Sequence, residues 1–199
     1  MSFSNISFIL NKPQLSENIG ACARAMKNFN FSKLVVIDPK PTFPNDKILA
    51  TSVGAKEVIK KAKLFNNFES SLSEFDFLIA TSSRFRNKNI KHISLNDLNK
   101  INFNKRIGFI FGSEASGLSN YEISYVNCTM NIPSNDKFKS LNLSHSLILV
   151  CYSLFELLSK KKTNYKKSKK IKIASKKNIQ SMMHQCISNL EKINFFNPE

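Results

Sequence analysis

Two glycines and a carboxylate lie close together in the decapeptide FGSEASGLSN (111–120). Gly112 and Gly117 have the spacing of the glycines in a phosphate-binding Walker A loop, and Ser119 stands where that loop has Ser or Thr, but Leu118 stands where it requires Lys. Without the lysine there is no point charge for terminal phosphates, and Glu114 would repel them. The decapeptide therefore speaks against a nucleoside triphosphate. It is compatible with a ligand that combines adenine, ribose hydroxyls and a cationic centre, such as S-adenosylmethionine.

Two more polar loops follow apolar runs in the same way. TSSRFR (81–86) comes after DFLIAT (76–81), and PSNDKFKSLN (133–142) comes after CTMNIP (128–133). In an open parallel sheet, ligands bind at the carboxyl ends of the strands. We therefore expect these two loops and the decapeptide to line one crevice.

Arg24 lies in NIGACARAMK (18–27), within a helical pattern that is otherwise small and apolar. One interpretation is an arginine whose stem packs on the helix while its guanidinium reaches solvent. The other is recognition of a phosphate or a ribose, because the planar guanidinium matches phosphate oxygens. If the start of the helix points at the crevice, we expect Asn18 and Arg24 to lie roughly on one side of it.

Three polar side chains of the segment SLNLSHS (140–146) have different interpretations. Ser140 is a possible helix N-cap. Asn142, at the start of an apolar helix, must find partners in a turn, a backbone group or a ligand. His145 is more often a structural or surface histidine than a base at such a position. No Ser-His-Asp or paired-carboxylate arrangement is indicated.

Apolar runs that alternate with helical patterns must position these side chains. Such alternation predicts an α/β fold with a mostly parallel sheet. We expect strands at 6–10, 33–38, 76–81, 106–112 and 128–133, and helices at 15–29, 46–61, 140–160 and 178–193. Ser16 is the expected N-cap of the first helix. The long apolar helix at 140–160 would pack on the sheet or at a subunit interface.

Charge is unevenly distributed along the 199 residues. The chain has 30 Lys and Arg against 14 Asp and Glu, a net charge of +16, which suits a polyanionic partner such as nucleic acid. Residues 160–177 hold ten of the lysines and no acid, and such a block is typical of an interaction tail or a solvated linker. We therefore expect a domain at 1–159, a Lys-rich linker at 160–177 and a short helical extension at 178–199.

Cysteine spacing and hydropathy exclude several other classes of protein. The four cysteines are scattered, with no CxxC pair and no histidine at a ligand spacing, so we expect reduced thiols in a cytoplasmic protein and no metal site. No stretch reaches the roughly 20 apolar residues that span a bilayer. The first ten residues do not have the pattern of a signal peptide. We therefore expect no membrane partner.

Three stretches, in this order, resemble the motifs of the SPOUT superfamily of RNA methyltransferases. They are NIGACARAMKNFNFSKLVVIDP, IGFIFGSEASGLSNYEI and MNIPSNDKFKSLNLSHSLILVCYSL, and TSSR between them also fits. The resemblance covers about residues 5–158 and is greatest to the TrmH/TrmJ branch of ribose 2'-O-methyltransferases, TrmJ-type enzymes in particular. It implies a SPOUT α/β-knot fold with a C-terminal trefoil knot, a homodimer and S-adenosylmethionine (SAM) as cofactor.

The resemblance also implies roles for residues that match the motifs. Arg24, Ser140 and Asn142 match catalytic positions. Candidate RNA contacts are Asn18, Arg24, Arg84 and Arg86. Cofactor-binding positions are Thr81, Ser82, Ser83, Gly112, Glu114, Gly117, Ile132, Ser140, Leu141 and Asn142.

The implied reaction is methyl transfer to a ribose 2'-OH of tRNA, at nucleotide 32 of the anticodon loop. Methylation of ribosomal RNA is the first alternative, and an inactive RNA-binding protein with the same fold is the second. The presence of Arg24, Ser140, Asn142 and Glu114 speaks against loss of catalysis. The chain stops sooner after the matched domain than TrmJ-type chains usually do, and the Lys-rich segment could partly substitute in RNA binding.

Overall fold

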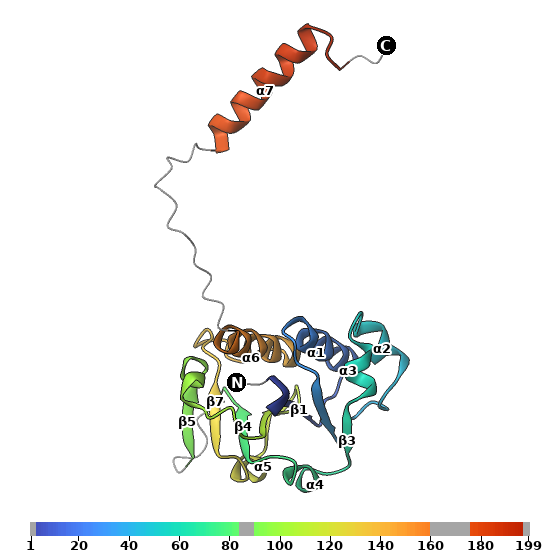
Figure 1. Cartoon of the computed structure of the whole chain (residues 1–199), viewed down its shortest axis with the longest axis vertical. Coiled ribbons are helices and arrows are strands. Elements are labelled where there is room, and N and C mark those ends of the chain that lie inside the picture. Colours follow the sequence, from blue (N-terminus) through green and yellow to red (C-terminus); the bar gives the residue numbers. More distant parts are fainter. Residues whose placement is uncertain (1–2, 84–89, 160–175, 197–199) are drawn as a thin grey trace. The chain divides into compact units, whose positions relative to one another are not determined.

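The computed structural model describes residues 3–83, 90–159 and 176–196 (Figure 1). Contacts divide the chain into two compact units, Met1–Lys161 and Lys162–Glu199. Arg84 and Arg86, and residues 160–175 of the linker expected at 160–177, lie outside the described residues.

One parallel sheet forms the centre of the first unit. Within the described residues it has seven strands in the order β3-β2-β1-β6-β4-β7-β5. Their bounds are β1 Ile6–Asn11, β2 Lys33–Ile37, β3 Lys63–Phe65, β4 Phe77–Thr81, β5 Lys91–Ser94, β6 Ile107–Phe111 and β7 Cys128–Asn131. Every neighbouring pair is parallel, so the predicted α/β class with a mostly parallel sheet is confirmed.

The central strands are buried on both faces, as expected for a sheet covered by helices on each side. Along β1, Ile6, Phe8 and Leu10 belong to one apolar cluster and Ile9 to a second one. This alternation follows from the period of two in a strand. It explains why ISFIL is a continuous apolar run.

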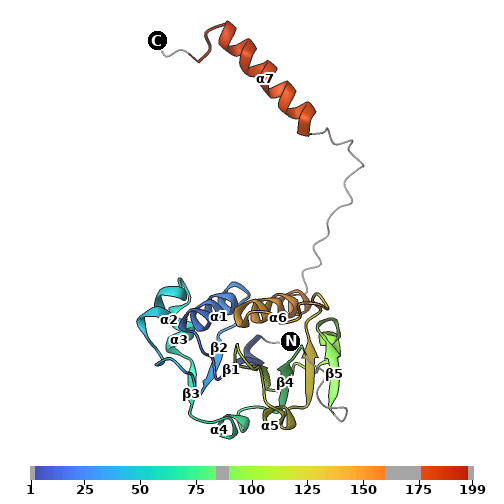
Figure 2. The ribbon, with the colours of Figure 1, turned by 180° about the vertical axis from the view of Figure 1, so that it is seen from behind.

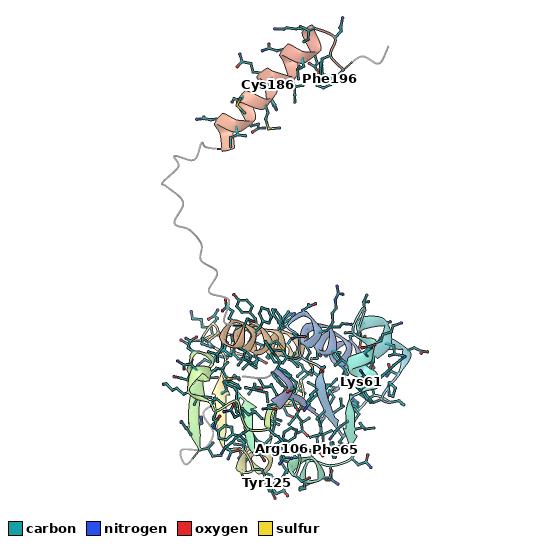
Figure 3. All side chains as sticks on the ribbon, viewed as in Figure 1. Lys61, Phe65, Arg106, Tyr125, Cys186 and Phe196 are labelled. Atoms are coloured by element: carbon teal, nitrogen blue, oxygen red, sulfur yellow. The ribbon has the colours of Figure 1, made fainter. Side chains whose placement is uncertain are left out.

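Helices cover both faces of the sheet. Their bounds are α1 Ser16–Asn28, α2 Asp46–Thr51, α3 Lys56–Lys60, α4 Glu69–Leu72, α5 Asn120–Ser124 and α6 Leu143–Leu158, with 3₁₀ helices at Phe3–Asn5 and Leu95–Lys100. The longest two, α1 and α6, lie side by side with α2 and α3 on one face, and α4 and α5 lie on the other (Figures 1 and 2). Side chains fill the space between the layers (Figure 3).

The prediction of one continuous helix at 46–61 was wrong. The structure has two short helices, because the chain turns at residues 52–55, where Gly54 has a φ of +74°. Two edge strands, β3 and β5, were also missed. They are only three and four residues long, so they are too short to show a clear period-two pattern.

The second unit contains helix α7, Lys176–Lys192. Its apolar side chains recur at helical spacing, and Met182, Met183 and Ile187 are 59%, 52% and 43% exposed. Cys186 lies on this helix and Phe196 follows it (Figure 3). The prediction of one helix near 178–193 is confirmed, with a start two residues earlier.

Candidate functional site

A hollow lies at the carboxyl ends of β4, β6 and β7, where the three loops were expected to meet. Nine of the ten predicted cofactor positions line it: Thr81, Ser82, Ser83, Gly112, Glu114, Gly117, Ile132, Ser140 and Leu141. The remaining lining residues, which the sequence did not single out, are Phe111, Ser113, Ala115, Ser116, Leu118, Asn131, Lys139, Leu143 and Ser146. The expected shared crevice is therefore present.

The wall formed by residues 112–118 is a tight loop that depends on its glycines. A Cβ on Gly112 would come within 2.3 Å of the Gly117 carbonyl carbon, so the two backbones can approach only without a side chain there. Gly117 has a φ of +69°, and its N–H donates to the Ser113 carbonyl at 2.9 Å. Gly112 therefore permits the close approach of the two backbone segments, and Gly117 permits the left-handed backbone conformation of the turn.

Glu114 connects this loop to the start of α1. Its carboxylate accepts hydrogen bonds from the backbone N–H of Gln14 at 2.8 Å and of Leu15 at 3.3 Å. It also accepts from the Asn18 side chain at 2.7 Å. A carboxylate that accepts several N–H groups at a helix N-terminus is favoured by the helix dipole. Glu114 therefore holds the loop in place while it lines the hollow.

The predicted N-cap at Ser16 was wrong. The N-cap of α1 is Leu15, which has no side-chain capping bond, and Ser16 is the first helical residue. The Glu114 carboxylate binds backbone N–H groups just before the helix instead. Local sequence could not reveal this arrangement, because the acceptor comes from a position about a hundred residues later.

Asn142 has two structural tasks at the start of α6. Its side-chain oxygen accepts from the backbone N–H groups of Ser144 and His145, at 2.8 and 3.4 Å, and so caps the helix. Its amide nitrogen donates to the Asn18 oxygen at 3.1 Å. Ser140 is not the N-cap, because α6 begins only at Leu143. Asn142 does not line the hollow, although it lies directly after Leu141, which does.

Asn18 and Arg24 do not share one side of α1. Six residues at 100° each place them about 120° apart around the helix axis. Asn18 is 7% exposed and bonded to Glu114 and Asn142, whereas Arg24 is exposed. Within the described part of the chain, the Arg24 guanidinium makes no hydrogen bond or ion pair. It is available to an anionic ligand.

A buried carboxylate on the other side of the loop was missed by the sequence prediction. Glu122 accepts from the Asn11 side chain at 2.7 Å, and Ser119 and Glu122 form a capping box at the start of α5. Burial alone would raise the pKa of Glu122, but hydrogen bonds from Ser119 and Asn11 outweigh it, so that the pKa lies below its usual value. The sequence signal was the S-x-x-E pattern at 119–122.

The remaining histidine and cysteine side chains are exposed, hydrogen-bonded or buried. His145 is exposed, and the His92 ring is hydrogen-bonded to the Thr129 hydroxyl. Cys22, Cys128 and Cys151 are buried, and burial raises the pKa of Cys128 to about 11. In the part of the chain that the structure describes, no three His, Cys, Asp or Glu side chains group as metal ligands. In the same residues, no helix combines the length and apolar character needed to cross a membrane.

Comparison with known proteins identifies this arrangement. The model of the SpoU rRNA Methylase family matches residues 5–152. The chain belongs to the SpoU methylase family. The matched residues include all three loops of the hollow, Arg24 and the start of α6. The predicted membership in the SPOUT methyltransferases, TrmJ branch, is therefore confirmed.

Relatives within and around the SpoU family agree with this assignment. The chain is 34% identical over 155 residues to a protein of Methanocaldococcus jannaschii named tRNA (cytidine-2'-O-)-methyltransferase TrmJ, covering 75% of this chain and 67% of that one. It is 33% identical over 159 residues to the Escherichia coli protein LasT, named an uncharacterized tRNA/rRNA methyltransferase, covering 77% and 69%. The crystal structure of TrmJ from Z. mobilis superposes with a TM-score of 0.72 at 26% identity, covering 96% and 82%.

Proposed function

We propose that this protein is a SAM-dependent tRNA ribose 2'-O-methyltransferase that acts at nucleotide 32 of the anticodon loop. The observation that carries the proposal is the hollow at the ends of β4, β6 and β7, lined by nine of the ten cofactor positions that the motifs imply. The relatives named as tRNA 2'-O-methyltransferases support the reaction and the substrate class. They align with about three quarters of this chain and about two thirds of their own length.

The lining residues fit SAM chemically. Ile132, Leu141 and Leu143 supply apolar surface for an adenine, while Ser82, Ser113 and Ser116 supply hydroxyls for polar groups. The hollow has a volume of about 170 Å³. That is below the roughly 300 Å³ at which pockets begin to enclose a drug-sized ligand. A nucleoside-sized ligand would keep part of its surface open, where an RNA can reach it. When bound, SAM supplies an electrophilic methyl group.

Arg24 has the role of an electrostatic catalyst in this proposal. The ribose hydroxyl gains negative charge as it attacks, and a guanidinium can bind the adjacent phosphate and stabilise the developing alkoxide. A guanidinium is not deprotonated in proteins, so it serves better as a hydrogen-bond donor than as the base. Its exposure and its lack of a partner among the described residues suit this role.

Ser140 and Asn142 position the reaction from the start of α6. Ser140 lines the hollow, whereas Asn142 is fixed by Asn18 and by the first turn of α6. Holding two reactants in near-attack geometry is worth about 7–11 kcal/mol at best. In this proposal, Ser140 contacts the reacting ribose and Asn142 keeps the loop that carries Ser140 in register with α1.

A homodimer is also part of the proposal. Four large apolar side chains of α6, Ile148, Leu149, Tyr152 and Phe155, are 36–47% exposed along the outer side of a helix that is otherwise packed on the sheet. Such a surface is suited to a second copy of the chain. The trefoil knot and a cytoplasmic location stay predictions of the resemblance.

Ribosomal RNA is the second candidate substrate. The description of the matching family favours it, since it refers to rRNA. Methyl transfer from labelled SAM to bulk tRNA and to ribosomal RNA separates the two, and mapping of the product then tests nucleotide 32. Tight RNA binding without transfer to either RNA would overturn the enzymatic function and favour an RNA-binding protein.

A further inference from the structure

Phe138 is the most exposed large apolar side chain of the described residues, at 76%. It lies in the loop between β7 and α6. The turn around it is defined by hydrogen bonds, with Phe138 N–H donating to the Asn135 carbonyl at 2.9 Å and Lys137 N–H donating to the Asn135 side chain at 3.0 Å. Asp136, inside this turn, forms an ion pair with Lys139 at 3.0 Å. The exposure of the ring is therefore a property of an ordered turn.

The turn that carries the ring leads directly into the wall of the hollow. The next three residues, Lys139, Ser140 and Leu141, all line the hollow. Phe138 is therefore two residues from Ser140, the lining residue to which the motifs assign a catalytic role. A single exposed apolar residue needs no explanation by itself. An exposed ring next to a site for an RNA substrate can stack on a base of that RNA.

Lysines flank the ring on both sides. Lys137 is exposed and forms no ion pair among the described residues, and Lys139 carries a second ammonium group at the edge of the hollow. Lys139 is paired with Asp136, so Lys137 is the cation next to the ring that is left to neutralise a phosphate. An exposed ring next to such a cation is the combination that binds single-stranded nucleic acid, because bases stack on the ring and the cation neutralises the backbone. A paired base has both faces covered by its neighbours in the duplex and offers no free face for such stacking.

We infer that Phe138 stacks on an unpaired base beside the methylated nucleotide, with Lys137 contacting the RNA backbone. The inference rests on the proposed function and adds to it a side chain that recognises an unpaired base next to the target nucleotide. It makes Phe138 a residue that recognises the RNA without taking part in SAM binding. A second copy of the chain that covers the ring is the competing explanation.

The test compares Phe138→Ala, Phe138→Tyr and the unchanged protein in binding to bulk tRNA and to RNA hairpins that carry 2-aminopurine at each loop position in turn. Loss of one stacked base should weaken RNA binding of Phe138→Ala by roughly 10- to 100-fold, and Phe138→Tyr should stay within about threefold. One 2-aminopurine position should be quenched by the unchanged protein and not by Phe138→Ala. Leu64→Ala, at an exposed apolar residue of the edge strand β3, is the matched control and should behave as the unchanged protein.

Two further measurements complete the design: calorimetry measures SAM binding, and sedimentation measures the oligomeric state. Phe138→Ala should bind SAM and sediment as the unchanged protein does. RNA binding and quenching equal to those of the unchanged protein would overturn the inference and leave the proposed function intact. A change in sedimentation of Phe138→Ala would also overturn it, in favour of a subunit contact. If the unchanged protein binds hairpins through Phe138 but transfers no methyl group, the inference holds and the proposed function fails.

Discussion

The Asn18 side chain donates a hydrogen bond to the Glu114 carboxylate at 2.7 Å, across 96 positions of sequence. The oxygen of the same amide accepts from Asn142 at 3.1 Å. One buried amide therefore joins α1, which carries Arg24, to the loop after β6 and to the start of α6. The side chains that the motifs assign to cofactor and RNA are thus fixed relative to each other before any ligand binds.

Replacing Glu114 by Ala should loosen this junction. The change leaves the N–H groups of Gln14 and Leu15 and the Asn18 amide without their acceptor, and a lost charged hydrogen bond costs about 1.5–3 kcal/mol. We expect a lower melting temperature and an affinity for SAM weakened by roughly tenfold or more. Circular dichroism melting and calorimetry with SAM measure the two effects.

The control for this change is Glu17→Gln, which alters another carboxylate near the start of α1. Glu17 is half-exposed and pairs with Lys47 on the surface at 2.6 Å, a kind of contact worth about 0–1 kcal/mol. This variant should bind SAM normally. An equal loss of SAM affinity in both variants would show that Glu114 has no special role.

Arg24→Ala should abolish most methyl transfer without changing stability. The side chain is exposed and has no partner among the described residues, so its removal leaves the fold intact. Loss of one donor that stabilises a developing oxyanion lowers the rate by about 100- to 1,000-fold. Single-turnover transfer to tRNA at saturating SAM measures this effect.

Arg24→Lys separates charge from geometry. A lysine keeps the positive charge but lacks the planar fork, so we expect it to recover RNA binding more than rate. Lys27→Ala, one turn further along α1, is the matched surface control. Transfer by Arg24→Ala within about threefold of the unchanged protein would remove the catalytic role of the guanidinium.

The central strands and the longest helices were predictable from sequence because their patterns are strong. The buried run IGFIF and the apolar helix that becomes α6 were predicted within a few residues of their observed bounds. The two-helix segment at 46–60 and the edge strands were not. Their elements are three to six residues long, and tertiary packing decides the structure of such short segments.

The site was predictable in its composition and less so in its internal bonds. The loop order and the rule for parallel sheets placed the hollow correctly. The hydrogen bonds of Glu114 and Asn142 could not be predicted, because their partners at the start of α1 lie about a hundred or more residues away. The capping role of Asn142 was also missed, because Ser140 was the simpler candidate for the N-cap of the same helix. Sequence reasoning left the partners of Asn142 open between a turn, a backbone group and a ligand, and it did not identify Asn18 as the residue that both side chains contact.

The exposed apolar side of α6 gives a test of the homodimer. Leu149→Arg places a charge on a surface that we propose to be buried between two copies, where an unpaired charge is strongly unfavourable. We expect a monomer at micromolar concentration by sedimentation, whereas Leu64→Arg on β3 should sediment as the unchanged protein does. A dimer that persists in Leu149→Arg would assign the interface to another surface, and a monomeric unchanged protein would remove the dimer from the proposal.

Gly112→Ala should distort the cofactor loop. The new methyl group would meet the backbone of Gly117 and Leu118 at 2.3–2.7 Å, so the loop must move. We expect little or no SAM binding by calorimetry, with circular dichroism still showing the folded sheet. SAM affinity equal to that of the unchanged protein would mean that the loop does not form the wall of the cofactor site.

The pair of Asp76 and Arg106 gives a prediction for pH dependence. Hydrogen bonds from the Arg106 side chain, and then from its backbone, lower the pKa of Asp76 to about 2 from 3.8. A carboxyl whose pKa is lowered in the folded state stabilises the fold above its unfolded value, and this contribution is lost as the pH falls towards the folded value. Asp76→Asn should therefore melt at a lower temperature than the unchanged protein at pH 5–7, and the difference should close between about pH 4 and pH 2. Melting curves at low ionic strength measure it, with Glu57→Gln as the exposed control. A difference that stays constant down to pH 2 would show that Asp76 acts through packing at the start of β4, because only the charged carboxylate depends on pH in this way.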